Sequence, residues 1–118
     1  KQSNRDDLAL FVFDVGTKIA GVYTKSHFAA APVVVAKENE KSSLSWIVNS
    51  GNANAATGYR GETDARKTCQ LVAERLSLPN NSVQPFSTGV IGEFLPMSRV
   101  AEAVGEASSK LTPGEWER

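Results

Sequence analysis

Hydrophobic residues gather in four short runs over the first fifty positions, and these runs predict β-strands. The runs are rich in Val, Phe and Tyr, and turn-forming residues bound them. They cover residues 8–14, 19–25, 32–37 and 44–50. The chain is therefore expected to open with a strand-rich region.

In the second half the apolar positions recur every three or four residues, which is typical of amphipathic helices. One helix is expected over 61–77, and its buried face would comprise Ala65, Cys69, Val72, Ala73 and Leu76. A short strand over 82–88 follows, although Pro85 weakens that pattern. A second helix is expected over 97–111, with an apolar face of Val100, Ala103, Val104, Ala107 and Leu111. The pattern predicts a mixed α/β (α+β) fold.

The 118 residues suit one domain with one core. Near the end, "TPGE" at 112–115 combines a Thr N-cap, a Pro at the first helical position and a Glu three residues after the cap. This arrangement predicts a helix start, yet the sequence stops at Arg118. We therefore expect residues 1–118 to be a single-domain portion of a longer or processed polypeptide.

Charge and composition exclude several classes of partner. Thirteen basic and thirteen acidic side chains are interspersed, which argues against nucleic acid as a ligand. The apolar run at 28–36 is far shorter than the ~20 residues of a membrane-spanning helix, and the first seven residues lack an apolar targeting core. A single cysteine permits no internal disulfide. These features predict a soluble protein of a reducing compartment, the cytoplasm.

Two loops of small residues follow predicted strands. "NSGNANAATG" at 49–58 is a Gly-containing loop between a strand and a helix, a setting in which backbone N–H groups can bind phosphate. Its glycine spacing fits neither the G-x-G-x-x-G motif nor the P-loop pattern of nucleotide-binding proteins. A structural turn is therefore the favoured interpretation. In "FSTGVIGE" at 86–93, backbone N–H groups and the Thr88 hydroxyl could stabilise an oxyanion. Taken alone, this loop too reads better as a turn.

Isolated reactive residues add little chemistry. Cys69 lies on the apolar face of its helix, where thiols pack as inert groups, so a pair with His27 is not expected to be catalytic. One His and one Cys cannot form a structural zinc site, and no metal is predicted. Trp46 and Phe86 are expected in the core.

Several separated segments resemble ornithine acetyltransferases, also called glutamate N-acetyltransferases. They occur in the order and spacing of the N-terminal part of that family and run along nearly the whole chain: "RDDLAL" (5–10), "AGVYT" (20–24), "AAPVVV" (30–35), "NSGNANAATG" (49–58) and "STGVIGEFLPM" (87–97). Five segments in register are far more specific than either loop alone.

The resemblance implies a fold and a reaction. Family members have a layered α/β sandwich of the aminopeptidase and acetyltransferase type, similar to N-terminal-nucleophile enzymes. The precursor cleaves itself before a threonine into an α and a β chain, which are expected to form an α2β2 heterotetramer. That threonine takes acetyl from N-acetylornithine and passes it to glutamate in arginine biosynthesis. No cofactor is implied; some members also accept acetyl-CoA, giving an amino-acid N-acetyltransferase activity. In a eukaryote the compartment would be an organelle matrix.

The resemblance also assigns roles to residues of this chain. The oxyanion donors of the family correspond to Thr88 and Gly89. The loop 49–58 would support them, through Asn49, Ser50, Gly51, Asn52 and Asn54. The sequence departs from the family pattern at Ala56, where Cys is common, and at Tyr23, Lys25 and Ser26. The nucleophile and the main substrate-binding residues would lie beyond Arg118.

Two alternatives stay open at this stage. A related N-terminal-nucleophile aminopeptidase or amidohydrolase would use the same kind of nucleophile but transfer acyl groups to water. A non-enzymatic metabolite-binding module would use the small-residue loops as a ligand nest.

Overall fold

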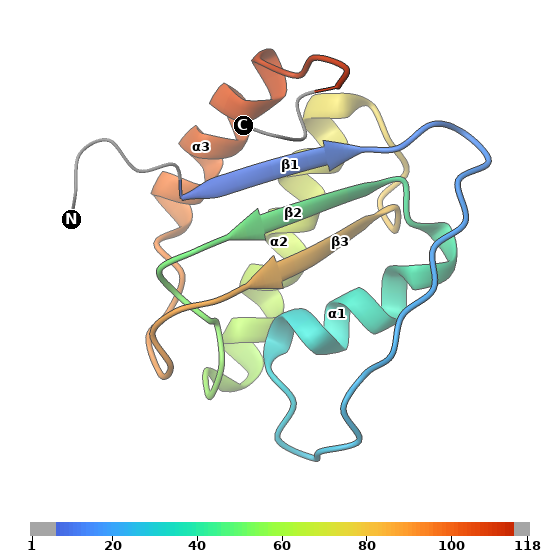
Figure 1. Cartoon of the computed structure of the whole chain (residues 1–118). Coiled ribbons are helices and arrows are strands. Elements are labelled where there is room, and N and C mark those ends of the chain that lie inside the picture. The colour runs from blue at the N-terminus through green and yellow to red at the C-terminus, as the bar shows by residue number, and fades with distance from the viewer. Residues whose placement is uncertain (1–6, 115–118) are drawn as a thin grey trace.

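A computed structural model of the chain describes residues 7–114 and contains a three-stranded sheet. The strands β1 (Leu8–Val12), β2 (Ser45–Asn49) and β3 (Val83–Ser87) lie in the order β1-β2-β3 (Figure 1). Strand β1 pairs antiparallel with β2, and β2 pairs parallel with β3. A parallel pair requires a long crossover, and helix α2 (Gly58–Leu76) lies within it. The mixed α/β class is confirmed.

Helices α2 and α3 (Met97–Ser109) pack on one face of the sheet, behind it in Figure 1. Helix α1 (Ala31–Asn39) lies along β3 and also contacts α2, and a short 3₁₀ turn, η1 (Glu40–Ser42), continues it. Ile47 of β2 and Val83 of β3 meet the helices in the core, with side chains from all three: Ala31, Val35, Ala65, Cys69, Val72, Ala73, Val100 and Val104.

Both amphipathic helices are confirmed with shifted ends. Helix α2 begins at Gly58 rather than 61, and α3 ends at Ser109 rather than 111. Leu111 therefore lies outside the helix and is exposed. Of the helix start expected at 112–115, Thr112 to Gly114 form a coil and turn, and the remainder lies outside the described residues. No helix within 7–114 is long and apolar enough to span a membrane.

The strand predicted at 32–37 is wrong, because this segment forms α1. Pro32 lies in the first helical turn, where its missing N–H is not needed. The helix buries Pro32 and Ala36 on one side, together with Ala31 and Val35. A run of Val lowers helix propensity by only a few tenths of a kcal/mol per residue, and packing against β3 and α2 exceeds that preference.

The strand predicted at 19–25 is also wrong. This segment belongs to a long connection between β1 and α1 that pairs with no strand among the described residues. Val22 is 99% exposed, so the hydrophobic pattern there is not satisfied by burial in this chain. Tyr23 is half-buried, and its hydroxyl accepts a hydrogen bond from Gln84 Nε2 at 3.2 Å.

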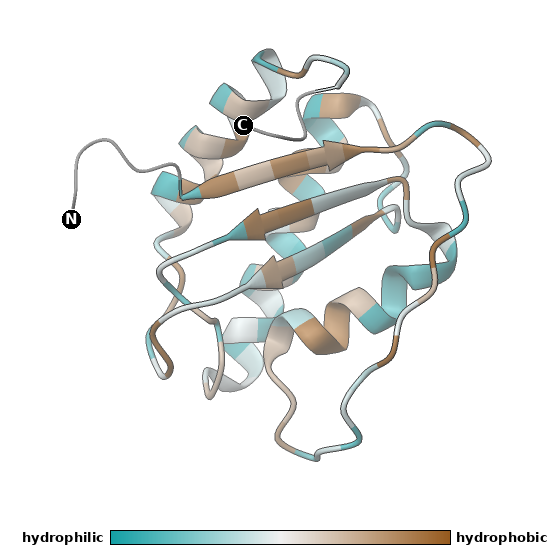
Figure 2. Cartoon of the chain, in the orientation of Figure 1, coloured by the Kyte–Doolittle hydropathy of each residue, from teal (hydrophilic) through white to brown (hydrophobic). Residues whose placement is uncertain are grey.

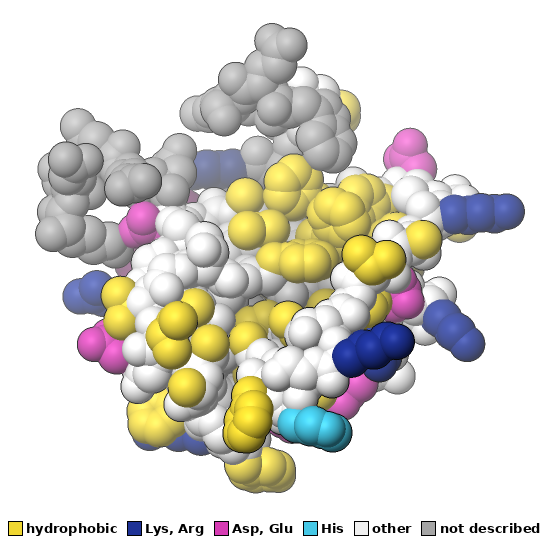
Figure 3. Space-filling view, turned by 60° about the horizontal axis from the view of Figure 1, so that its bottom comes forward, with side chains coloured by type: hydrophobic (Ala, Val, Ile, Leu, Met, Phe, Trp, Pro, Cys, Tyr) yellow, Lys and Arg dark blue, Asp and Glu magenta, His cyan; other side chains and the backbone are white. Residues whose placement is uncertain are grey.

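The opposite face of the sheet carries aromatic side chains that no helix of the described chain covers. The Trp46 ring lies edge-on to Phe13, with centroids 4.9 Å apart, and to Phe86, at 5.4 Å. Phe86 is 36% exposed, which corrects its assignment to the core, and Trp46 is half-buried. Strand alternation explains this, because Val83 and Pro85 point to the helices. Strand β1 is hydrophobic along most of its length, whereas β2 and β3 mix hydrophobic and polar positions (Figure 2), and hydrophobic side chains gather on this side of the molecule (Figure 3).

Candidate active site at the ends of two parallel strands

Two loops meet where β2 and β3 end. Strands β2 and β3 are parallel, and Asn49 is in register with Ser87. The segments that follow the two strands therefore leave the sheet at the same end. Loop A (residues 49–58) and loop B (residues 87–95) then continue side by side, and Asn52 forms an isolated bridge with Val90. The carboxyl ends of parallel strands are the usual place for ligands in open α/β sheets.

Main-chain hydrogen bonds join the loops along their length. Thr88 N donates to Asn49 O at 3.1 Å, Val90 N to Gly51 O at 3.3 Å, and Gly92 N to Ala55 O at 2.8 Å. Ala53 N returns a bond to Val90 O at 2.9 Å. Every second N–H of loop B is therefore directed at loop A, as in a strand. The intervening N–H groups are left for other partners.

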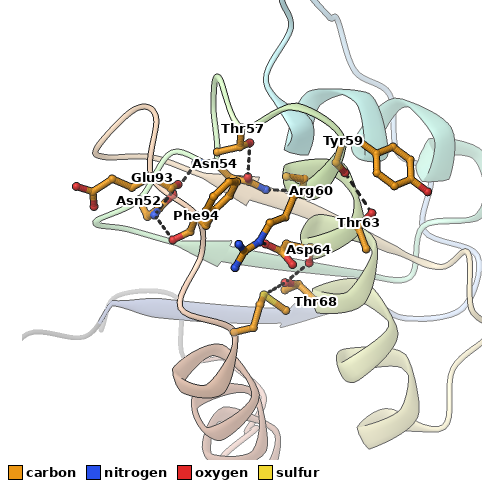
Figure 4. A network of polar contacts seen from close by, with 12 residues as sticks. Asn52, Asn54, Thr57, Tyr59, Arg60, Thr63, Asp64, Thr68, Glu93 and Phe94 are labelled. Carbon is orange, nitrogen blue, oxygen red and sulfur yellow. Dashed lines mark hydrogen bonds and ion pairs between the residues drawn. The ribbon is translucent and has the colours of Figure 1, made fainter.

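Asparagine side chains fix the shape of loop A. Asn49 Nδ2 donates to Asn52 O at 2.9 Å, and Asn49 Oδ1 accepts a bond from Ser87 Oγ. Asn54 is fully buried in a left-handed conformation with φ of 48°; its Nδ2 donates to Gly61 O and its Oδ1 accepts from Thr57 Oγ1 (Figure 4). These bonds connect loop A to the first turn of α2.

The main chain of Asn54 also holds helix α1. Ala31 N, at the start of α1, donates to Asn54 O at 3.3 Å. Loop A thus binds the N-terminal ends of two helices as well as loop B. Loop A follows a core strand yet consists of small residues, because main chains must approach one another closely here. Its short polar side chains form hydrogen bonds with the N–H and C=O groups of those main chains.

Gly89 lies where the loops are closest. It has φ of +131°, and a Cβ built on it would overlap the main chain of Gly51 and Asn52. No other residue fits this position without displacing loop A. Loop B can therefore place an N–H at Gly89 that no side chain shields.

The two candidate oxyanion donors lie together at this point. Thr88 and Gly89 are exposed. Since Thr88 N already donates to Asn49 O, Thr88 can contribute only through its hydroxyl. Within the described part of the chain, neither the Thr88 hydroxyl nor Gly89 N has a hydrogen-bond partner. One hydroxyl donor and one backbone donor on adjacent residues form a pair suited to a developing oxyanion.

The structure places the other candidates outside this chemistry. Cys69 is buried in the core, and burial raises the pKa of its thiol to about 12. His27 is exposed in the connection that precedes α1. Ser50 is exposed at the start of loop A, where its N–H donates to Asp7 O at 2.8 Å. Between residues 7 and 114 no group of three or more His, Cys, Asp or Glu side chains is arranged to hold a metal ion.

Sequence reasoning missed the far end of loop B. Asn52 Nδ2 donates to the carbonyl oxygens of Glu93 and Phe94, both at 3.1 Å. The Arg60 guanidinium lies 3.9 Å above the centre of the Phe94 ring. Asn52 and Glu93 are 41 positions apart, so no local sequence pattern predicts their contact. Only the pairing of the two loops could have indicated it.

Comparison with known proteins identifies the family. The model of the ArgJ family matches residues 1–117. The chain belongs to the ArgJ family. It is 45% identical to the arginine biosynthesis bifunctional protein ArgJ of Methylococcus capsulatus over 99% of this chain, and 39% identical to that of Colwellia psychrerythraea over 98%. It spans 29% and 30% of those relatives' lengths.

Two solved structures share the fold. The crystal structure of arginine biosynthesis bifunctional protein ArgJ from Bacillus halodurans superposes with a TM-score of 0.82 at 41% identity, covering 89% of this chain and 56% of that one. The crystal structure of ornithine acetyltransferase complexed with ornithine, from Mycobacterium tuberculosis, superposes with a TM-score of 0.83 at 33% identity. This match covers 90% of this chain and 59% of that one. The predicted family and its α/β fold of the ornithine acetyltransferase type are confirmed.

Proposed function

We propose that this ArgJ-family chain supplies the oxyanion hole of an acetyltransferase that moves acetyl from N-acetylornithine to glutamate in arginine biosynthesis. The observation that carries the proposal is the unpartnered pair of donors, Thr88 hydroxyl and Gly89 N–H, held at the meeting point of two interlocked loops. The names of the relatives, arginine biosynthesis proteins and an ornithine acetyltransferase, support the substrate class.

The remainder of the relatives' length supplies the nucleophile in this proposal. The hydroxyl of an N-terminal threonine, deprotonated by its own α-amine, attacks the acetyl carbonyl carbon, and the carbonyl π electrons move to oxygen. Thr88 and Gly89 would donate to that oxyanion. Collapse breaks the C–N bond, the α-ammonium returns the proton to the leaving amine, and ornithine departs. The glutamate amine then attacks the acetyl-threonine ester by the same steps.

The proposal includes the assembly and the second acetyl donor. Precursor cleavage gives this chain a β-chain partner, in an α2β2 enzyme of the cytoplasm. An acetyl thioester such as acetyl-CoA presents the same carbonyl oxygen to the donors, so it can replace N-acetylornithine as a substrate. No cofactor bound to this chain is required.

Substitution of Thr88 in the full-length, processed enzyme tests the function. Thr88→Ala should lower kcat by roughly 10²- to 10³-fold with little change in the KM for N-acetylornithine, because an oxyanion donor acts in the transition state. Thr88→Ser should recover much of the loss. Val90→Ala, on an exposed side chain of the same loop, is the matched control and should retain activity.

Precursor cleavage needs its own measurement, because an uncut precursor would imitate a catalytic defect. A denaturing gel reports it for each variant. Wild-type kcat in fully processed Thr88→Ala would remove Thr88 from the oxyanion hole. Faster release of acyl groups to water than to glutamate, or from peptide amides than from N-acetylornithine, would instead favour the aminopeptidase or amidohydrolase alternative.

A further inference from the structure

The Asn52 side chain uses its hydrogen-bonding groups to connect the two loops. Its Nδ2 donates to Glu93 O and Phe94 O, each at 3.1 Å, and its Oδ1 accepts from Asn54 N at 2.8 Å (Figure 4). Asn54 is in turn buried and bonded to the first turn of α2. The far end of loop B is thereby tied to a buried part of the fold.

Loop B has little apolar burial to hold it in place. Val90 is 51% exposed, Ile91 68% and Phe94 47%. The Arg60 guanidinium over the Phe94 ring adds a contact at an exposed site, where interactions of this type are weak. Gly89 and Gly92, both with positive φ, leave the loop backbone few steric restraints of its own. Its conformation therefore depends on the hydrogen bonds to loop A.

Those bonds are unevenly spread along loop B. Main-chain bonds fix its start at Thr88 and its middle at Val90 and Gly92, whereas the Asn52 side chain binds its end at Glu93 and Phe94. Immediately beyond, Leu95 is buried. Asn52 thus holds the end of loop B with its side chain, while its own main chain lies against Gly89 and bridges to Val90.

We propose that Asn52 is a positioning residue that fixes the direction of the Gly89 N–H through its hold on Glu93 and Phe94. This inference rests on the proposed function of Thr88 and Gly89. A donor must lie about 2.7–3.1 Å from the place where the oxyanion forms, and must already be in place when the charge develops. Gly89 lies directly against the main chain of Asn52, so releasing the Asn52 side chain shifts that main chain and moves the Gly89 N–H away from the oxyanion. Asn52 itself touches no reacting atom in this proposal.

The isosteric change Asn52→Asp tests the role in the full-length enzyme. It keeps the oxygen that accepts from Asn54 N, but it replaces the donor by an oxygen that repels the carbonyls of Glu93 and Phe94. We expect kcat to fall roughly 10- to 10²-fold, the size of loss that a 1 Å misplacement can produce. The KM for N-acetylornithine should stay within about twofold, because ground-state binding does not use the donor.

Two further variants keep the test informative. Asn52→Ala removes the bonds to Glu93 and Phe94 without adding repulsion, and it should also lower kcat with little change in KM. This variant carries the test if Asn52→Asp fails to fold. Ile91→Ala is the matched control, a 68% exposed side chain of loop B, and should retain wild-type kcat. Circular dichroism and a denaturing gel confirm folding and precursor cleavage for each. Wild-type kcat in folded, processed Asn52→Ala would overturn the inference.

A double-mutant cycle separates positioning from general weakening of the fold. If Asn52 acts through the oxyanion hole, Asn52→Asp should cost less in a Thr88→Ala background than in the wild type, because part of the hole is already lost. Equal fold-losses in both backgrounds would overturn the inference. If Thr88→Ala is slow but Asn52→Asp is not, only this inference fails; wild-type kcat in Thr88→Ala refutes the proposed function itself.

Discussion

Gly89 shows how a single residue can decide the geometry of the site. The bridge between Asn52 and Val90 keeps the register of Asn49 with Ser87, which puts Gly51 opposite Gly89. Two residues without side chains thus face each other where the loops are closest. The physical requirement is space as well as conformation, because both glycines have positive φ and Gly89 has the other loop's main chain against it.

Gly89→Ala should be far more damaging than Gly92→Ala. Both positions have positive φ, so both substitutions carry a backbone strain of about 1–3 kcal/mol. Only at Gly89 does the new Cβ meet main-chain atoms, whereas at Gly92 it has open space. We expect acetyl transfer to be largely lost in Gly89→Ala and largely kept in Gly92→Ala, measured as kcat on processed enzyme. Equal activities would show that loop A yields to the added methyl group.

Cys69 is predicted to be structural. Cys69→Ala should keep turnover near wild type and lower the free energy of unfolding by about 1 kcal/mol or somewhat more, for the small cavity it leaves. Urea unfolding and steady-state kinetics measure the two effects. A folded Cys69→Ala enzyme without turnover would contradict this assignment.

Alkaline pH gives an independent test of the same burial. The thiol has a pKa of about 12 in the fold against an ordinary 9.0, so the neutral form is the one the fold favours. Its contribution to stability is fully present below about pH 9 and is lost as the pH rises from there toward 12, because the unfolded chain ionises first. Between pH 8 and 10 the wild type should therefore lose more stability than Cys69→Ala. Identical slopes for the two proteins would argue against a buried neutral thiol.

At the scale of elements, helix α1 is held to the sheet by specific contacts rather than by its own sequence preference. Asn39 Nδ2 donates to Val83 O on β3 at 2.8 Å, and Gln84 Nε2 donates to Ala36 O at 2.9 Å. The Gln84 Oε1 atom also accepts from Trp46 Nε1. These bonds satisfy polar groups where α1 meets β3, and they couple the helix to both parallel strands.

Asn39→Ala and Glu38→Ala compare a part-buried and an exposed contact of this helix. Removing Asn39 leaves the carbonyl of Val83, a fully buried residue, without that donor, which should cost about 1–3 kcal/mol. Glu38 forms a 2.8 Å ion pair with Arg66 of α2, but both side chains are more than 40% exposed, so its loss should cost less than about 1 kcal/mol. Chemical unfolding of the two variants measures the difference. A larger loss for Glu38→Ala would show that the ion pair holds the helix.

At the scale of the whole molecule, helices cover only one face of the sheet in the described chain. Helices cover the face of Ile47 and Val83, while the face of Phe13, Trp46 and Phe86 has no covering element in the described chain. Val15, Val22 and Phe28, in the connection after β1, are further exposed hydrophobic side chains. The chain spans less than a third of the length of its curated relatives.

Residues 1–118 expressed alone are therefore predicted to be insoluble or molten. An exposed aromatic face favours aggregation and dye binding, and co-expression with the proposed β chain should restore a soluble complex. Intact mass of the native protein, thermal melting and binding of a hydrophobic dye report these states. A cooperative transition with sharp tertiary signals from the isolated chain would contradict the prediction.

The sequence by itself determined the elements whose pattern is local. The spacing of Ala65, Cys69 and Val72 was enough to predict helix α2, and the apolar run around Ile47 was enough to predict strand β2. Each pattern depends only on residues a few positions apart in the sequence. Family membership and the two loops could also be predicted, since five segments carry them. The assignment of Thr88 and Gly89 as donors stays a prediction with supporting geometry.

Only the tertiary structure decided the rest. The segment 32–37 is a helix because β3 and α2 bury one side of it, and Phe86 is exposed because no helix of the described chain covers its face of the sheet. The opposition of Gly51 to Gly89 and the bond from Asn52 to Glu93 join residues about 40 positions apart. Such contacts follow from the register of two parallel strands, which packing sets and which no local pattern encodes.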